Sequence, residues 1–167
     1  MAAQSSGRVT IYSRLRIQPL PMLSSLQTLA HRVKDVTGHP HHDLGISLVS
    51  PKKIASMNKE YRNKRGITDV LSFSAKSQST DRFGSLQNDL GDLFVCPQMI
   101  AKDAAEERVS LEYQWRRILI HGVLHLAGYD HETDEDYEKM SAAEILALKR
   151  IIEWENSDKN LFPTLFK

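Results

Sequence analysis

The sequence predicts an α+β fold in which a small mixed β-sheet of about four strands is covered by about five helices. Three observations lead to this prediction. Short apolar or alternating segments typical of strands lie in the first half of the chain, and helical patterns of apolar residues dominate the second half. The length of 167 residues suits one domain with a continuous core and leaves no room for a second domain. We therefore expect a single domain over residues 1–167, with residues 1–8 as a flexible tail.

The first strand and helix are predicted from short-range patterns. Val9–Tyr12 has the composition of a strand, and a helix from about Leu23 to Thr37 carries apolar residues at helical spacing. Gly38 should end this helix, because glycine readily adopts the left-handed conformation of a C-terminal cap. A second strand, Leu44–Val49, follows after a short loop.

The next helix has a clear start signal. Ser50 is a good N-cap, and Pro51 suits the first turn, where its missing N–H group costs nothing. The helix should continue through Tyr61 and turn Ile54, Met57 and Tyr61 towards the core.

Two strands and three helices complete the chain. The strands are Val70–Phe73 and Leu90–Val95, separated by a polar loop in which we expect mobility. The helices are predicted from Pro97 to about Arg108, from a cap at Ser110 to Gly128, and from about Asp134 onwards. The last helix should direct an apolar set inwards, comprising Tyr137, Met140, Ile145, Leu148 and Ile151.

Composition limits the classes of function. Hydrophobic residues make up 41% and charged residues 26%, which is typical of a globular protein, and no apolar run is long enough to span a membrane. The single cysteine, Cys96, excludes an intrachain disulfide and agrees with a reducing compartment, so we expect a cytoplasmic protein. A formal charge of +1 means that contact with nucleic acid must come from a local cluster.

One such cluster lies around the second predicted helix. Its basic residues are candidates for binding RNA, although a solvated helix face would have the same pattern. The candidates are Lys52, Lys53, Lys59, Lys64 and Arg65, together with Arg62.

Three histidines form a candidate zinc site. His121 and His125 are four residues apart on a predicted helix, so both rings can reach one metal ion. Gly128 allows the chain to turn back after the helix, so that His131 can converge on the same point. Three protein ligands with one open position are typical of catalytic zinc.

The pattern differs from that of zinc proteases. In those enzymes a glutamate directly after the first histidine is the general base, and here that position is Gly122. A metal-dependent protease or amidase would need a base from elsewhere. A ribosome-associated assembly factor with structural zinc is a third hypothesis.

Four segments resemble the YbeY-type endoribonucleases, also called rRNA maturation factors. They are the end of the second helix (58–62), Thr-Asp-Val-Leu-Ser-Phe (68–73), Leu-Gly-Asp-Leu (90–93) and the histidine motif (121–131). The resemblance extends over most of residues 44–144. Two positions differ from the family: Ser74 stands where proline is usual, and Cys96 where serine is common.

The resemblance implies a zinc-dependent endoribonuclease that cuts single-stranded RNA. Its implied role is 16S-type rRNA 3′-end maturation and ribosome quality control, with the small ribosomal subunit and its assembly factors as partners. Arg62, which matches the Tyr-Arg of the family, is the candidate donor to the phosphate in the transition state. Asp69 and Asp92 are expected to fix loops or orient a histidine.

Overall fold

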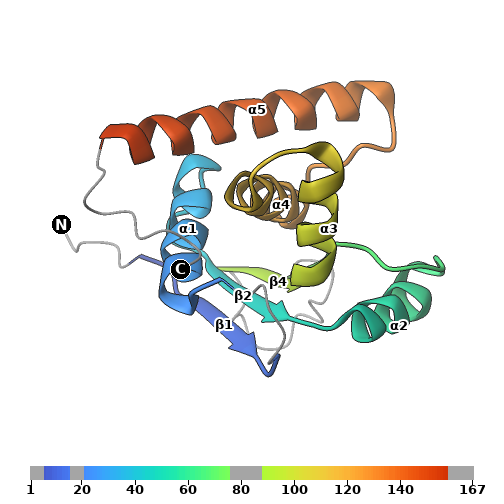
Figure 1. Cartoon of the computed structure of the whole chain (residues 1–167). Coiled ribbons are helices and arrows are strands. Elements are labelled where there is room, and N and C mark those ends of the chain that lie inside the picture. Colours follow the sequence, from blue (N-terminus) through green and yellow to red (C-terminus); the bar gives the residue numbers. More distant parts are fainter. Residues whose placement is uncertain (1–5, 16–20, 76–87, 158–167) are drawn as a thin grey trace.

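The computed structural model describes residues 6–15, 21–75 and 88–157. Within these residues a four-stranded sheet is combined with five helices, which confirms the predicted α+β class (Figure 1). The predicted element boundaries agree within one or two residues, and the loop expected to be mobile falls at 76–87, outside the described residues. In chain order the elements are β1 (Val9–Ser13), α1 (Leu23–Val36), β2 (Asp43–Leu48), α2 (Pro51–Arg62), β3 (Val70–Ser74), β4 (Asp89–Val95), α3 (Pro97–Glu107), α4 (Leu111–Leu126) and α5 (Asp134–Ser157).

The sheet has the strand order β1-β2-β4-β3. β1, β2 and β4 are parallel, and β3 pairs antiparallel with β4, in a register that sets Leu71 opposite Phe94. The sheet is therefore mixed, as predicted, and β3 is one of its edge strands. Side chains alternate along β2, where Leu44, Ile46 and Leu48 are buried.

Helix α4 lies at the centre of the helical layer. It packs against β3 and β4 and is contacted by α1, α3 and α5, and α5 extends across both α1 and α4 in Figure 1. Trp115 and Leu119 of α4 are fully buried. A Cβ atom at Gly122 would lie 2.9 Å from Cδ2 of Leu93, so glycine here allows the helix to approach the sheet closely.

Helix α2 packs against β3 and forms a smaller second core, which contains Ile54, Met57, Leu71 and Cys96. Ser50 accepts a hydrogen bond from the backbone N–H of Lys53, which confirms the predicted cap. The predicted burial of Tyr61 is wrong, because its side chain is 58% exposed. The last turn of α2 extends past this small core, and Tyr61 contacts the ring of Phe73, which packs against this core.

The predicted inner face of α5 is partly wrong. Met140 and Ile151 are buried as expected, but Tyr137 and Ile145 are 62% and 67% exposed. The buried stripe is narrow and includes the small Ala147, which allows close packing against the neighbouring helices. Ile145 belongs to the adjacent stripe, whereas Tyr137 continues the spacing of the buried stripe in the first turn of α5 and is left exposed there.

Residues 6–8 of the predicted tail are joined to the fold by hydrogen bonds, whereas residues 1–5 lie outside the described residues. The N–H of Gly7 donates to the carbonyl of Pro40 at 3.0 Å, and the Gly7 carbonyl accepts from Nζ of Lys34 at 2.8 Å. Lys34 is fully buried, and burial lowers its pKa. This segment caps the region between α1 and β2.

Among the described helices, none is both long and apolar enough to cross a membrane.

Candidate metal centre

Two histidines project from one face of the last turns of α4. His121 and His125 are four residues apart, and their Nε2 atoms lie 3.1 Å from each other. Their rings meet edge to face, with centroids 4.5 Å apart. The helical spacing predicted from the sequence therefore produces the expected pair.

Hydrogen bonds define which nitrogen of each ring carries the proton. Nδ1 of His121 lies 2.7 Å from Oε1 of Glu144, and Nδ1 of His125 lies 3.0 Å from the carbonyl oxygen of Tyr129. Both oxygens are acceptors, so both Nδ1 atoms must be donors. In the neutral rings each Nε2 then carries a lone pair, and the two lone pairs converge where a cation would relieve their repulsion.

The third histidine reaches the site through a tight turn. Gly128 has φ +101°, and the N–H of Tyr129 donates to the carbonyl of Leu124, so the chain reverses directly after α4. The His131 ring centroid lies 5.0 Å from that of His125. The same turn positions the Tyr129 carbonyl that orients His125. Gly128 thus helps to position both His125 and His131, whereas the sequence analysis connected it only with His131.

The three histidines fit a zinc ion. One potential ligand atom from each lies within 4.8 Å of the others, and no other such group of metal-binding side chains occurs in the described residues. Two nitrogens bound to one zinc ion in tetrahedral geometry lie about 3.3 Å apart, close to the separation found for His121 and His125. Burial lowers the pKa of His125, and the neighbouring His121 and His131 lower it further, which favours the neutral form that binds metal.

Glu144 is a candidate functional residue that the sequence analysis missed. It lies on α5, and its carboxylate accepts the hydrogen bond from His121 of α4. Carboxylates in this position typically fix the orientation of a ligand histidine and increase its basicity. A signal was present in the sequence: with Met140, Ala147 and Ile151, Glu144 follows the spacing of the buried stripe, where an unpaired acid is rare.

The histidines open into a cavity of about 930 Å³. Arg62 and Lys64 line the same cavity, so the structure brings the predicted arginine and the three histidines together. Arg62 donates from Nη2 to the carbonyl of Ser72 at 2.9 Å, which ties its guanidinium to the edge strand β3. Ser72 in turn donates from Oγ to the carbonyl of Gly122 on α4. A chain of contacts thus connects Arg62 to the metal helix.

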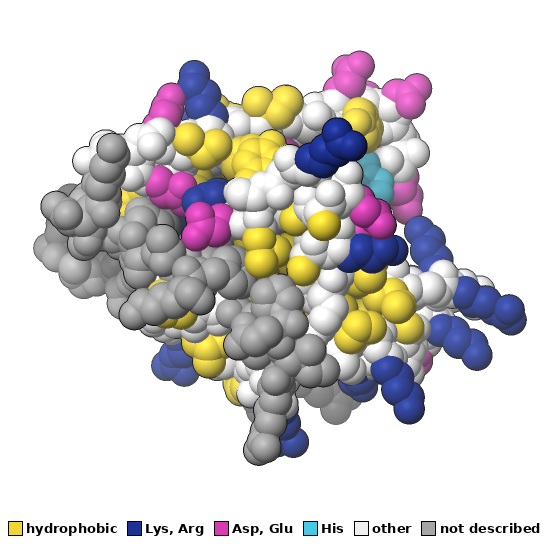
Figure 2. Space-filling view, in the orientation of Figure 1, with side chains coloured by type: hydrophobic (Ala, Val, Ile, Leu, Met, Phe, Trp, Pro, Cys, Tyr) yellow, Lys and Arg dark blue, Asp and Glu magenta, His cyan; other side chains and the backbone are white. Residues whose placement is uncertain are grey.

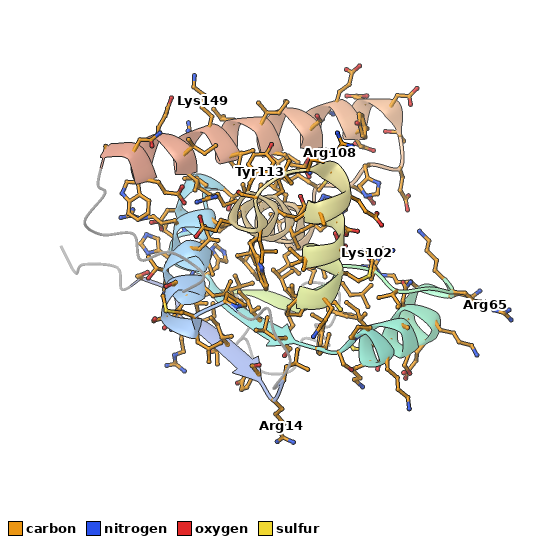
Figure 3. All side chains as sticks on the ribbon, viewed as in Figure 1. Arg14, Arg65, Lys102, Arg108, Tyr113 and Lys149 are labelled. Atoms are coloured by element: carbon orange, nitrogen blue, oxygen red, sulfur yellow. The ribbon has the colours of Figure 1, made fainter. Side chains whose placement is uncertain are left out.

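The other predicted RNA-binding residues are exposed but lie outside the lining of this cavity. They are Lys52, Lys53, Lys59 and Arg65. Figure 2 shows lysine and arginine side chains gathered over α2 and the segment after it, and Figure 3 shows Arg65 directed away from the body of the molecule. These residues form a basic surface over α2 and the segment that follows it.

Three further residues that the sequence analysis singled out are Asp69, Asp92 and Cys96. Asp69 accepts hydrogen bonds from the Thr68 hydroxyl at 3.1 Å and the Val70 N–H at 2.7 Å, so it fixes the start of β3, as expected. Asp92 lies on β4, and burial raises its pKa. Cys96 is fully buried in the second core, away from the histidine group, and makes no side-chain cap for α3.

Comparisons with known proteins identify the family. A family model described as Endoribonuclease YbeY matches residues 17–152. The chain belongs to this family. Relatives named Endoribonuclease YbeY include one from Francisella tularensis subsp. novicida, 34% identical over 135 residues (80% of this chain and 82% of the relative), and one from Francisella philomiragia, 32% identical over 133 residues (80% and 84%).

Membership makes the chain a hydrolase of the endoribonuclease class and confirms the resemblance found in the motifs. The fold has a match among solved structures as well. A Thermotoga maritima protein determined in solution superposes with a TM-score of 0.54 over 93% of this chain and 99% of that one, at 23% identity. At that identity the likeness supports the architecture alone.

Proposed function

We propose that this protein is a zinc-dependent endoribonuclease that cuts single-stranded RNA. Its substrate would be ribosomal RNA during 16S-type 3′-end maturation and quality control, in the cytoplasm, with the small ribosomal subunit and its assembly factors as partners. One observation carries the proposal: three histidines with converging nitrogens share a cavity with an anchored arginine, in a chain of an endoribonuclease family.

The histidines would hold one zinc ion per chain through their ring nitrogens. Bound there, zinc would act as a Lewis acid and activate water for attack on a phosphodiester. Glu144 and the Tyr129 carbonyl keep His121 and His125 in the tautomer that such binding requires.

Arg62 would stabilise the charge that develops on the phosphate. A guanidinium has five N–H donors, and the contact with Ser72 uses one of them while holding the group in place. Such preorganised donors are effective because they need not reorganise when the transition state forms. The planar geometry also suits two phosphate oxygens at once.

The metal hypothesis is tested by elemental analysis of the purified protein. We expect one zinc per chain, with most of it lost in the triple alanine variant of His121, His125 and His131. Metal-free wild-type protein, or a triple variant that retains its zinc, would contradict the proposal.

The Arg62 hypothesis is tested by single-turnover cleavage of a short unstructured RNA. Arg62→Ala should retain fold and zinc but cut about 100-fold more slowly, and Arg62→Lys should recover only part of the rate. Arg14→Ala is the matched control, since Arg14 is exposed just after β1, at the opposite edge of the sheet from β3 (Figure 3). Cleavage by Arg62→Ala at the wild-type rate would refute the role.

A protease or amidase remains the alternative enzyme. The edge strand β3 lines the cavity, and an extended peptide could pair with such an edge. Against this, Gly122 stands where the zinc proteases have their general base. Parallel assays with casein, a peptide library and single-stranded RNA distinguish the two substrates.

An assembly factor with structural zinc makes a different prediction. If zinc were structural, His125→Ala should lower stability and ribosome binding together. If the proposal is correct, the variant should lose RNA cleavage and still bind ribosomes.

A further inference from the structure

Tyr61 is a large aromatic side chain left exposed inside the metal cavity. It lies in the last turn of α2, is 58% exposed, and lines the same cavity as the three histidines. Its position in the apolar spacing of α2 would have allowed burial, but the helix extends beyond the core there. An exposed aromatic ring beside a metal site is more informative than one on an open surface.

The Tyr61 ring is held by other aromatic rings. It meets Phe73 edge to face, with centroids 5.3 Å apart and an angle of 84°. Phe73 meets Phe94 in the same manner at 5.5 Å, and both phenylalanines pack against the buried second core. A perpendicular contact covers at most one face of a ring. One side of the Tyr61 ring is therefore in contact with Phe73, while 58% of the residue stays exposed beside the cavity.

The residues around Tyr61 are suited to bind the phosphate of a nucleotide whose base contacts Tyr61. Arg62 follows it directly and lines the same cavity, as does Lys64. A cationic group for the phosphate beside an open aromatic ring is the combination by which proteins bind single-stranded nucleic acid without reading its sequence.

We propose that Tyr61 stacks against one unpaired base of the RNA and so selects single-stranded substrate. The proposal rests on the function proposed above and adds the residue that recognises the strand. A base within a duplex is covered on both faces by its neighbours, so it cannot stack on a side chain. The same contact would hold the adjoining phosphate close to Arg62.

Tyr129 is the other exposed tyrosine of the cavity, at 40%. Its backbone carbonyl orients His125, and it directly follows Gly128 in the turn, so a shift of this turn on substitution would disturb the candidate metal site as well. Tyr61 lies on helix α2, outside this turn, and contacts Phe73, which makes the two effects separable.

The test measures equilibrium binding of a fluorescent single-stranded oligoribonucleotide and its duplex by anisotropy, with zinc chelated so that no cleavage occurs. The variants are Tyr61→Phe, which keeps a stacking ring, and Tyr61→Leu, which keeps apolar packing but cannot stack. Tyr12→Ala is the matched control, because Tyr12 is 62% exposed on β1, at the opposite edge of the sheet. Chemical unfolding and zinc content are recorded for each variant.

We expect Tyr61→Leu to bind the single strand about 5- to 100-fold more weakly, the range for losing one stacked base. Tyr61→Phe and Tyr12→Ala should bind as the wild type does, and duplex binding should not change. An abasic site at the stacked position should weaken wild-type binding but not that of Tyr61→Leu, because both changes remove the same contact.

Two outcomes would overturn the inference, and they are distinguishable. If the wild type binds and cuts single-stranded RNA while Tyr61→Leu matches it, Tyr61 is only a packing residue and the proposed function stands. If the zinc-loaded wild type neither binds nor cuts RNA, the proposed function itself fails, and the stacking role fails with it.

Discussion

Replacement of Glu144 is the perturbation that most directly tests the proposed metal centre, because Glu144 contacts His121, one of the proposed ligands. Its Oε1 accepts from Nδ1 of His121 at 2.7 Å, which is a short, charge-assisted hydrogen bond. Glu144→Gln keeps an acceptor in a side chain of the same size but removes the charge. Glu144→Ala removes both, and leaves the His121 ring free to rotate.

The expected magnitude follows from this contact. Hydrogen bonds to charged groups contribute about 1.5–3 kcal/mol when shielded, and both side chains here are about one third exposed, at 33% and 36%. Because both side chains are partly exposed, we expect the loss of the carboxylate charge alone to cost a free energy in the lower half of that range. We therefore expect Glu144→Gln to weaken zinc binding by about tenfold and Glu144→Ala by up to about 100-fold, as for other carboxylates behind ligand histidines.

The assay is competition for zinc with a chromophoric chelator, which reports a Kd independently of RNA cleavage. Glu153→Gln is the control on the same helix, since Glu153 is exposed and pairs only loosely with Lys149 at 3.8 Å. Unfolding of the metal-free proteins is measured in parallel. If both Glu144 variants bind zinc like the wild type and differ only in stability, the carboxylate merely joins α4 to α5 and the reasoning is refuted.

Three further predictions concern glycine geometry and surface charge. Gly128→Val should weaken zinc binding and lower the free energy of unfolding by about 1–3 kcal/mol, because φ +101° is strained for valine. Chelator competition measures the zinc affinity, and urea unfolding measures the stability. Unchanged values in both would exclude a left-handed turn at this residue. Gly122→Ala should cost about 1–3 kcal/mol of stability through contact with Leu93, and Leu93→Val in the same chain should recover part of it. Lys52→Ala and Lys53→Ala should weaken RNA binding equally for all sequences and flatten its salt dependence. The measurement is a titration of RNA binding at two salt concentrations. If neither the affinity nor its salt dependence changes, these lysines belong only to a solvated surface.

The elements of this fold could be predicted because their signals are local. Ser50 with Pro51, Gly38, and the apolar spacing within each helix act over a few residues, and each led to the correct boundary. His121 and His125 belong to the same class of signal, since four residues along a helix fix their separation whatever surrounds the helix.

Burial at the ends of helices could not be predicted in the same way. Tyr61 and Tyr137 continue apolar patterns, yet both are exposed, since the core surface they would cover ends before they are reached. Periodicity gives the direction of a side chain on its helix but not the extent of the partner surface. That extent depends on where β3 and α4 lie.

The sequence alone predicted the three histidines of the candidate metal centre, because two share a helix and the third follows a glycine turn within a few residues. Only the tertiary structure decided what surrounds them. Arg62 reaches the cavity because α2 packs on the edge strand β3, and Glu144 reaches His121 from 23 residues away because α5 packs across α4. Such contacts arise from the burial of helix faces against each other, which depends on the whole core and leaves no fixed spacing in the chain.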